Sequence, residues 1–490
     1  MSVHEPEFDA TTPFVEVLRR WAEHAPDRPA VSDPDRTLSR AQLDADSDAL
    51  ADAFAAQGVR AGSLVTIALP NEVAFFTAVV AAWKVGATPQ PVSSRSPDAE
   101  LARVLELAKP ALVVGRRVDG VPSIDLPLQG GRESGGDRRP GVVAASWKAP
   151  LSGGSTGAPK LIVSTLPARY GSLAPFAPLV RMRSQGISII PTPLSHNMGL
   201  LFGTLTLLTG GEVVILPRFT PESFVRVIDE RRATWAIAVP TMLHRTERLL
   251  TEGGLADLSS LEAVAVGASA CPQRLKEFWA DRLGPERMIE FYSTTENQVI
   301  ALADGGTWRS HPGSVGRVVV GELEVRDDTG AAVPEGTVGE LWMRRGATEP
   351  IPYRYLGAQA RRDDDGWDSV GDLGSIRNGY VYLADRASDM IIVGGSNVYP
   401  AEVEAALEEH PSVQSSCVIG LPDDEYGSRL HAIVQASSPL TAEELIAHLR
   451  ERLTPYKIPR TYTWTASAIR DDAGKVRRSA WREKVLSEQY

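Results

Sequence analysis

Cysteine and lysine are scarce in this chain of 490 residues. The two cysteines, Cys271 and Cys417, cannot form a disulfide framework and do not have the spacing of a metal site. Both are therefore expected to be small buried side chains. Lysine supplies only eight of the 51 basic residues, so the position of each lysine is informative.

Long apolar runs and an excess of basic charge are also missing. The longest apolar segments, at 74–83 and 198–208, are shorter than the roughly 20 residues that a membrane-spanning helix needs. The N-terminus has no basic region followed by an apolar run, so no signal peptide is predicted. The net charge of −11 argues against a nucleic-acid partner, which requires a basic surface. These absences predict a soluble, cytoplasmic protein without a membrane span.

The order of apolar and polar segments predicts an α/β fold with a largely parallel sheet, because helix and strand patterns alternate. Helices are expected at 39–58 and 72–86 and before 209, and strands at 63–69, 111–114, 187–190 and 213–216. Segment 129–141 is polar and glycine-rich, which is typical of an exposed loop. Glycine-punctuated β runs at 315–345 indicate an antiparallel subdomain. A change in composition near residue 385 suggests a large domain over 1–385 and a small α+β domain over 386–490.

Residues 151–160, LSGGSTGAPK, form the most informative segment of the chain. Glycines allow backbone N–H groups to converge on an anion, and hydroxyls and a closing ammonium add donors and charge. A plain Gly/Ser linker is the alternative. A Walker A loop is excluded, because Lys160 lies between Pro159 and Leu161. The candidate phosphate-binding residues are Ser152, Gly153, Gly154, Ser155, Thr156, Gly157 and Lys160.

This segment resembles the phosphate loop of the adenylate-forming superfamily, whose usual form is [ST]-[SG]-G-[ST]-T-G-x-P-K. That superfamily includes acyl-CoA and aryl-CoA ligases, luciferases and the adenylation domains of peptide synthetases. The resemblance implies ATP and Mg²⁺ as cofactors, with Thr156 among the metal-binding residues.

Two further segments resemble motifs of that superfamily that surround the reacting groups. Pro193–Gly199, PLSHNMG, is similar to P-L-x-H-x-x-G, whose histidine, here His196, lines the acid pocket. Tyr292–Glu296, YSTTE, is similar to Y-G-x-T-E, in which a threonine contacts the α-phosphate and the glutamate holds Mg²⁺. Glu296 at the start of a helix is the alternative. The implied nucleotide-binding residues in this region are Gly267, Ala268, Ser269, Phe291, Tyr292, Ser293, Thr294 and Thr295.

Two more segments resemble the ribose site and the hinge between the domains. Val370–Asp372 is similar to T-G-D, whose aspartate, here Asp372, accepts hydrogen bonds from the ribose hydroxyls, although a plain turn explains a Gly-Asp pair equally well. Asp385–Ile391, DRASDMI, resembles the hinge, with Arg386 contacting ribose or phosphate. Ser388 occupies the hinge position, where relatives usually have Asp or Lys. A hinge needs only residues that absorb a change in φ and ψ.

The C-terminal part carries motifs for the second substrate and for catalysis. Gly394–Glu404, GGSNVYPAEVE, resembles the segment along which CoA ligases pass pantetheine, and implies an acceptor channel at Gly394, Gly395 and Asn397. A turn into a helix at 400–409 is compatible with this. Leu453–Pro459 resembles L-x-x-Y-K-x-P. Arg470–Arg478 resembles P-R-x-x-x-G-K-x-x-R, which makes Lys475 the catalytic lysine.

These motifs follow the superfamily's order and, together with similar segments at 38–43 and 83–87, extend the resemblance over nearly the whole chain. It implies an acid–CoA ligase that converts a carboxylic acid into acyl-AMP, releases pyrophosphate and transfers the acyl group to CoA, with a mobile C-terminal domain. The Gly-Gly-Ser-Thr form of the loop favours a bulky, ring-containing acid. Transfer to an amine or to a carrier protein is the alternative. A non-catalytic nucleotide binder is disfavoured, because Lys160, Glu296, Asp372 and Lys475 are all retained.

Overall fold

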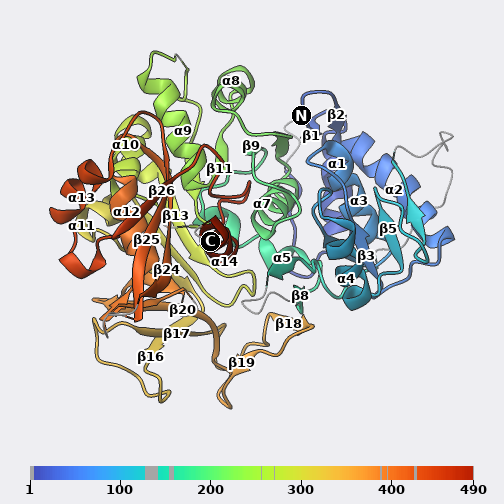
Figure 1. The fold of residues 1–490 in the computed structure, drawn as a ribbon. Coiled ribbons are helices and arrows are strands. Elements are labelled where there is room, and N and C mark those ends of the chain that lie inside the picture. The colour runs from blue at the N-terminus through green and yellow to red at the C-terminus, as the bar shows by residue number, and fades with distance from the viewer. Residues whose placement is uncertain are drawn as a thin grey trace.

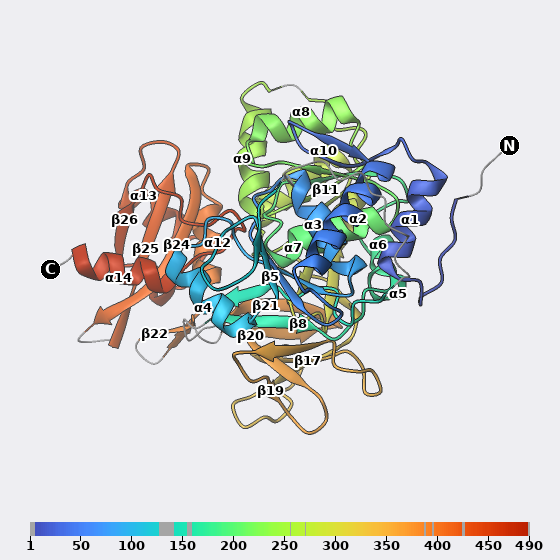
Figure 2. The ribbon, with the colours of Figure 1, turned by 90° about the vertical axis from the view of Figure 1, so that its right-hand side faces the viewer.

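A computed structural model describes residues 5–126, 142–153, 159–254, 256–269, 271–386, 389–393, 396–423 and 427–488. Most of these residues form a large body, and the chain from about residue 391 onwards forms a smaller lobe at its side (Figures 1 and 2). The glycine-rich segment 129–141, expected to be a loop, lies outside the described residues.

The largest sheet of the described residues crosses the large body. Its strands lie in the order β15 (Arg317–Val320), β14 (Ile300–Asp304), β13 (Met288–Ser293), β12 (Ala263–Val266), β11 (Trp235–Ala238), β9 (Ile187–Ile190), β10 (Glu212–Ile215), β1 (Pro29–Ser32) and β2 (Thr37–Ser39). Neighbours from β13 to β1 are parallel, whereas β2, β14 and β15 are antiparallel. The parallel strands are almost continuously apolar, as expected for strands buried on both faces.

A second, parallel sheet lies beside the first and has the order β4 (Thr88–Pro91), β3 (Leu64–Ile67), β5 (Leu112–Val114) and β6 (Ser123–Ile124). The helices of the large body are α1 (Phe14–His24), α2 (Arg40–Ala56), α3 (Val73–Lys84), α4 (Asp98–Ala108), α5 (Tyr170–Leu173), α6 (Phe176–Leu179), α7 (Asn197–Leu208), α8 (Pro221–Arg231), α9 (Pro240–Thr251), α10 (Gln273–Leu283) and α11 (Gly305–Ser310), with a 3₁₀ turn at Pro285–Arg287. This alternation confirms the predicted α/β fold, and the ends of the expected helices and strands differ from the observed ones by at most two residues.

Antiparallel strands form the base of the large body (Figure 1). One sheet contains β16 (Glu322–Arg326), β17 (Gly339–Arg344), β20 (Asp368–Arg377), β19 (Arg361–Arg362) and β21 (Tyr380–Arg386). Another has the order β18 (Tyr353–Leu356), β8 (Pro159–Ser164) and β7 (Leu151–Gly153). The antiparallel region expected at 315–345 is therefore present, and it continues to residue 386.

The C-terminal lobe has its own apolar core. Its strands are β22 (Ile391–Val393), β23 (Ser396–Val398), β24 (Val413–Asp423), β25 (Gly427–Ala436) and β26 (Thr461–Trp464), and its helices are α12 (Pro400–Glu408), α13 (Ala442–Arg450) and α14 (Arg478–Glu488), with a 3₁₀ turn at Pro455–Lys457. Val403, Leu407 and Leu445 are fully buried in this core. The helix expected at 400–409 is α12.

Local sequence signals explain where several helices begin. A capping box between Ser39 and Gln42 starts α2, and another between Thr441 and Glu444 starts α13. Both cysteines are buried, as expected. None of the helices in the described part of the chain is both long and apolar enough to cross a membrane.

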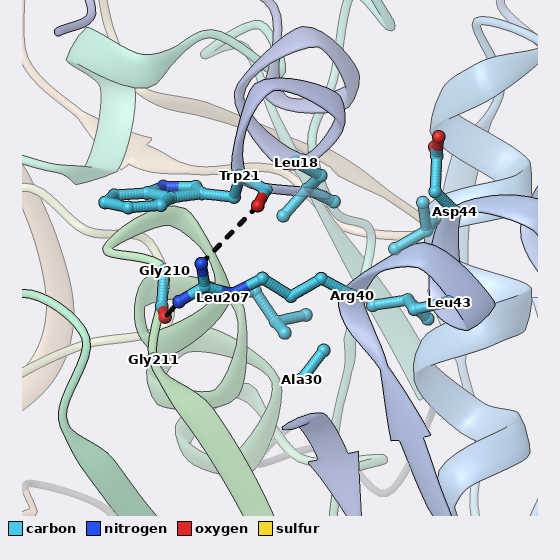
Figure 3. Close-up of a pocket in the computed structure, with 10 residues that line it drawn as sticks. Leu18, Trp21, Ala30, Arg40, Leu43, Asp44, Leu207, Gly210 and Gly211 are labelled. Atoms are coloured by element: carbon cyan, nitrogen blue, oxygen red, sulfur yellow. Dashed lines mark hydrogen bonds between the residues drawn. The ribbon is translucent and has the colours of Figure 1, made fainter. Parts of the chain in front are cut away.

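A buried arginine joins the first helices to the main sheet (Figure 3). Arg40, 4% exposed, donates to the carbonyls of Trp21 and Gly210 and lies 4.9 Å from the centre of the Trp21 ring. It also donates to the Gln185 side chain at 3.3 Å. Burial lowers the pKa of Arg40 to about 10, so the side chain stays charged at neutral pH. Arg40 therefore fixes α1 and α2 against the turn before β10.

Replacing Arg40 with methionine is expected to lower the free energy of unfolding by about 3 kcal/mol, because two buried carbonyls lose their donor. Thermal and urea unfolding of Arg40→Met would measure this, with Arg60→Met at an exposed site as the control. Equal stability of the two variants would contradict this account of the N-terminal helices.

Candidate functional site

Strands β7 and β8 pair with each other on either side of the predicted phosphate loop. Ser152 pairs with Lys160 and Gly153 with Pro159 across this hairpin. Gly154, Ser155, Thr156 and Gly157 lie outside the described residues. Lys160, after the loop, extends to Glu296: its Nζ is 3.7 Å from Glu296 Oε1 and 4.1 Å from the centre of the Tyr355 ring. The hairpin thus places the loop lysine beside the predicted metal ligand.

Glu296 lies in the turn between β13 and β14, so its interpretation as a helix-start residue is wrong. The residue is 5% exposed, and Tyr355 donates a hydrogen bond of 2.6 Å to its Oε1. Burial, together with the Glu296 carboxylate, raises the pKa of Tyr355, which keeps the phenol protonated as a donor. The carboxylate is therefore held in one orientation by two neighbours.

Asp372, the predicted ribose-binding residue, is connected through Tyr292 to the segment that carries Glu296. The Tyr292 hydroxyl donates to Asp372 Oδ2 at 2.7 Å. Asp372 belongs to strand β20 rather than to an isolated turn, and in the strand register it is paired with Arg386 of β21. This contact joins β13 of the main sheet to β20 of the antiparallel sheet, across 80 positions of the sequence.

Other residues predicted to bind nucleotide lie at the carboxyl ends of β12 and β13. Gly267, Ala268 and Ser269 follow β12, and a Cβ at Gly267 would be 2.8 Å from the Phe291 ring, so only glycine fits under this ring. Ser293 ends β13, and Thr294 and Thr295 follow it. The Thr294 hydroxyl is buried and has no hydrogen-bond partner among the described residues. A buried donor of this kind is expected to bind a ligand or a water molecule.

Lys475 belongs to the C-terminal lobe and His196 to the large body, and the charge of Lys475 acts on the His196 ring. Gly474, with φ +77°, turns the loop so that it packs on Val239, and Asp471 Oδ1 accepts from the Lys475 backbone N–H at 2.9 Å. Burial lowers the pKa of His196 below 6.5, and the charge of Lys475 lowers it further, against weaker opposing effects of Asp471 and Asp472. His196, just before α7, is therefore neutral at pH 7.

The predicted hinge and acceptor channel are less fully described. Ser388, Gly394 and Gly395 lie outside the described residues. Asn397 lies in β23, where its backbone pairs with Ile392. The roles of these residues stay predictions.

Motif comparison did not single out two side chains that reach this group. Tyr355 belongs to β18, and the register of β18 with β8 sets it beside Ile162, next to the phosphate hairpin. Lys148 precedes β7 and donates to Asn197 and to the carbonyl of Thr295. For Lys148 a sequence signal existed, since a lysine lies within the otherwise apolar and small residues before the phosphate loop. Tyr355 had no signal, because its place depends on strand pairing.

Comparison with known proteins agrees with this geometry. Residues 18–141 and 149–348 match the family model of the AMP-binding enzymes, and residues 402–471 match the AMP-binding enzyme C-terminal domain. The chain therefore belongs to the AMP-binding enzyme family, which confirms the predicted superfamily.

Three relatives show the range of the family around this chain. The long-chain-fatty-acid–CoA ligase FadD13 of Mycobacterium tuberculosis is 27% identical, over 97% of this chain and 98% of its own. The structure of the o-succinylbenzoate CoA synthetase MenE of Bacillus subtilis, with its acyl-adenylate, has a TM-score of 0.82 at 26% identity and covers 96% of this chain and 98% of its own. The amide bond synthetase McbA of Marinactinospora thermotolerans has a TM-score of 0.81 at 26% identity and covers 96% and 100%. CoA ligases and an amide synthetase are thus both similar to this chain.

Replacement of Tyr355 by phenylalanine is expected to lower kcat/KM for ATP about tenfold, because Glu296 loses a charge-assisted hydrogen bond. Acid-dependent pyrophosphate release, measured against ATP at several Mg²⁺ concentrations, would test this.

Tyr353→Phe is the matched control, since Tyr353 lies on the same strand but donates to Asp368 at 2.8 Å. A loss of the same size in both variants would indicate a general effect on β18 rather than a role for the Glu296 contact.

Proposed function

We propose that this protein is a ligase that activates a carboxylic acid with ATP, releases pyrophosphate from an acyl-AMP intermediate and transfers the acyl group to CoA. The observation that carries the proposal is the packing of the Lys475 loop on the large body, where Gly474 lies against Val239 and the charge of Lys475 acts on His196. In the large body Lys160 lies beside Glu296, and Tyr292 contacts Asp372. A protein that only binds nucleotide has no need of this arrangement.

Nucleotide binding would use the residues at the ends of β12, β13 and β20. Asp372, held by Tyr292, has carboxylate oxygens suited to the two ribose hydroxyls, and Arg386 is its register partner. Gly267, Ala268, Ser269 and Phe291 would surround the adenine, with Ser293. Thr294 and Thr295 would contact the α-phosphate, for which the unpartnered Thr294 hydroxyl is suited. Ser152 to Gly157 and Lys160 would surround the outer phosphates.

The donor set fits Mg²⁺ that arrives with ATP. Both described contacts of Glu296 fall on Oε1, which leaves Oε2 for a hard cation. Among the described residues no group of three or more His, Cys, Asp or Glu side chains could hold a metal. Glu296 and Thr156 would therefore supplement phosphate and water ligands, and the ion would neutralise phosphate charge.

Lys475 would act in acyl-adenylate formation. Attack of a carboxylate on the α-phosphate brings two anions together, and an ammonium that reaches both groups offsets their repulsion and positions them. Neutral His196 adds no charge of its own and lines the acid side of the site. These residues supply orientation and electrostatic stabilisation rather than a covalent intermediate.

Transfer of the acyl group would follow rotation of the C-terminal domain, 386–490, against 1–385 at Ser388. Rotation would withdraw Lys475 and bring Gly394, Gly395 and Asn397 to the site, where the thiol of CoA would enter. The likeness to FadD13 and MenE supports CoA as acceptor, and a bulky, ring-containing acid agrees with the aromatic acid of MenE. Direct transfer to an amine is the second candidate, which the likeness to McbA favours.

A panel of aromatic, polycyclic and aliphatic acids would test the proposal, with Mg·ATP and either CoA or simple amines present. We expect acid-dependent pyrophosphate release and a CoA thioester detected by mass spectrometry. An amide without thioester would assign the protein to the amine-transferring branch. Pyrophosphate release with none of the acids would count against the ligase assignment.

The Lys475→Ala variant is expected to lose adenylation by about a hundredfold or more, because the ammonium between the two anions is removed. It is also expected to convert supplied acyl-AMP with the acceptor at a rate near that of the wild type. Lys484→Ala, which removes a cation stacked on Trp481 in α14, serves as the control. Wild-type adenylation by Lys475→Ala would exclude the assigned role.

A further inference from the structure

Lys148 is a buried lysine at the junction of three predicted site segments. Its side chain is 2% exposed and its ammonium lies 4.8 Å from the centre of the Trp147 ring. The ammonium donates to Asn197 Oδ1, at the start of α7, and at 3.2 Å to the carbonyl of Thr295. It therefore connects the approach to the phosphate hairpin with the segment of His196 and with the turn that carries Glu296.

The contacts of Lys148 differ from those of the other buried lysines in the described chain. Lys84 pairs with the carboxylates of Asp44 and Asp48, and Lys276 pairs with Glu290 at 2.5 Å. The described acceptors of Lys148 are an amide and a backbone carbonyl, both neutral. Burial lowers the pKa of Lys148 to about 7, and the charge of Glu296 opposes this effect. A buried cation without a direct counter-ion is costly for the fold, which is typical of functional sites.

The backbone around Lys148 is hydrogen-bonded on both sides, so the position from which its side chain extends is fixed. The Lys148 carbonyl accepts from Ser164 of β8 at 3.0 Å, and the Ala149 N–H donates to Pro89 of β4 at 3.0 Å. The Trp83 indole donates to the Trp147 carbonyl at 2.9 Å. The backbone that carries the Lys148 ammonium is therefore held by both the second sheet and the β7–β8 hairpin.

We propose that Lys148 is a positioning residue for acyl-adenylate formation, which sets the spacing between the acid-side segment His196–Asn197 and the nucleotide-side turn Thr295–Glu296. This inference rests on the proposed ligase function. It adds to that function a residue that acts through Asn197 and the Thr295 carbonyl rather than by touching the reacting atoms.

The physical reason is the steep dependence of rate on the alignment of two reactants. The carboxylate bound near His196 and the phosphate bound near Thr295 approach from segments about 100 residues apart, and a misplacement of about 1 Å can cost about a hundredfold in rate. One ammonium with acceptors on both segments holds them at a defined separation. Once acyl-AMP has formed, a covalent bond fixes this separation, so the later transfer step needs Lys148 less.

Kinetics of Lys148→Met, which removes the charge at similar volume, would test the proposal with an acid that the wild type activates. We expect kcat for acid-dependent pyrophosphate release to fall about 10- to 100-fold. Conversion of supplied acyl-AMP with the acceptor should fall by less than about threefold, because the bond already sets the alignment. Asn197→Leu should reduce adenylation in the same direction, and the double variant should be little worse than Lys148→Met, because both changes break one contact.

Lys84→Met is the matched control, a buried lysine that pairs with α2 and is expected to lose stability but keep kcat. The proposal would be overturned if Lys148→Met keeps both adenylation and the conversion of acyl-AMP within about twofold of the wild type. Strictly additive losses in the double variant would also overturn it. If Lys148→Met does not fold, the kinetics of Asn197→Leu and Lys148→Arg test the proposal instead. A wild-type kcat for adenylation in both variants would overturn the proposal. A wild type that activates no acid would instead contradict the ligase function itself.

Discussion

The candidate site depends on one buried carboxylate. Glu296 is almost inaccessible, and its orientation is set by the Tyr355 hydroxyl at 2.6 Å and the Lys160 ammonium at 3.7 Å. Each neighbour belongs to a different segment, so the carboxylate ties the phosphate hairpin, strand β18 and the β13–β14 turn together. Burial in low dielectric strengthens these contacts and would make any unpartnered charge costly, so the three segments are constrained as a unit.

Cations surround the place where anions are expected to meet. Lys160 follows the predicted phosphate loop and lies beside Glu296, Lys475 comes from the C-terminal lobe, and Lys148 donates to the carbonyl of Thr295. Three of the eight lysines of the chain therefore lie in or beside the segments of the predicted site. Ammonium groups there would suit the binding of a polyphosphate and a carboxylate together. The described acceptors of Lys148 are neutral, whereas Lys84 and Lys276 have direct counter-ions.

Sequence motifs located most of this group, because the chemistry requires particular residue types in short segments. The loop ending at Lys160, the YSTTE segment, Asp372 and the Gly-Lys pair at 474–475 were all predicted from spacing and resemblance, and their roles stay predictions. The interpretation of Glu296 as a helix start failed because a carboxylate after a strand resembles one before a helix when only neighbours are considered. Tyr355 was missed because an isolated tyrosine in a β segment carries no motif.

The family, the α/β fold and the ends of most helices and strands could be predicted from the sequence, because these depend on local periodicity, capping residues and short motifs. The contacts of Tyr292 with Asp372, of Tyr355 with Glu296 and of Lys148 with Asn197 and Thr295 are visible only in the folded chain. Each of these contacts joins residues that are about 50 to 150 positions apart, and strand register and packing between separate elements determine them. A local sequence pattern contains no information on contacts between residues so far apart in the chain, so the arrangement of charges in the site could be seen only in the structure.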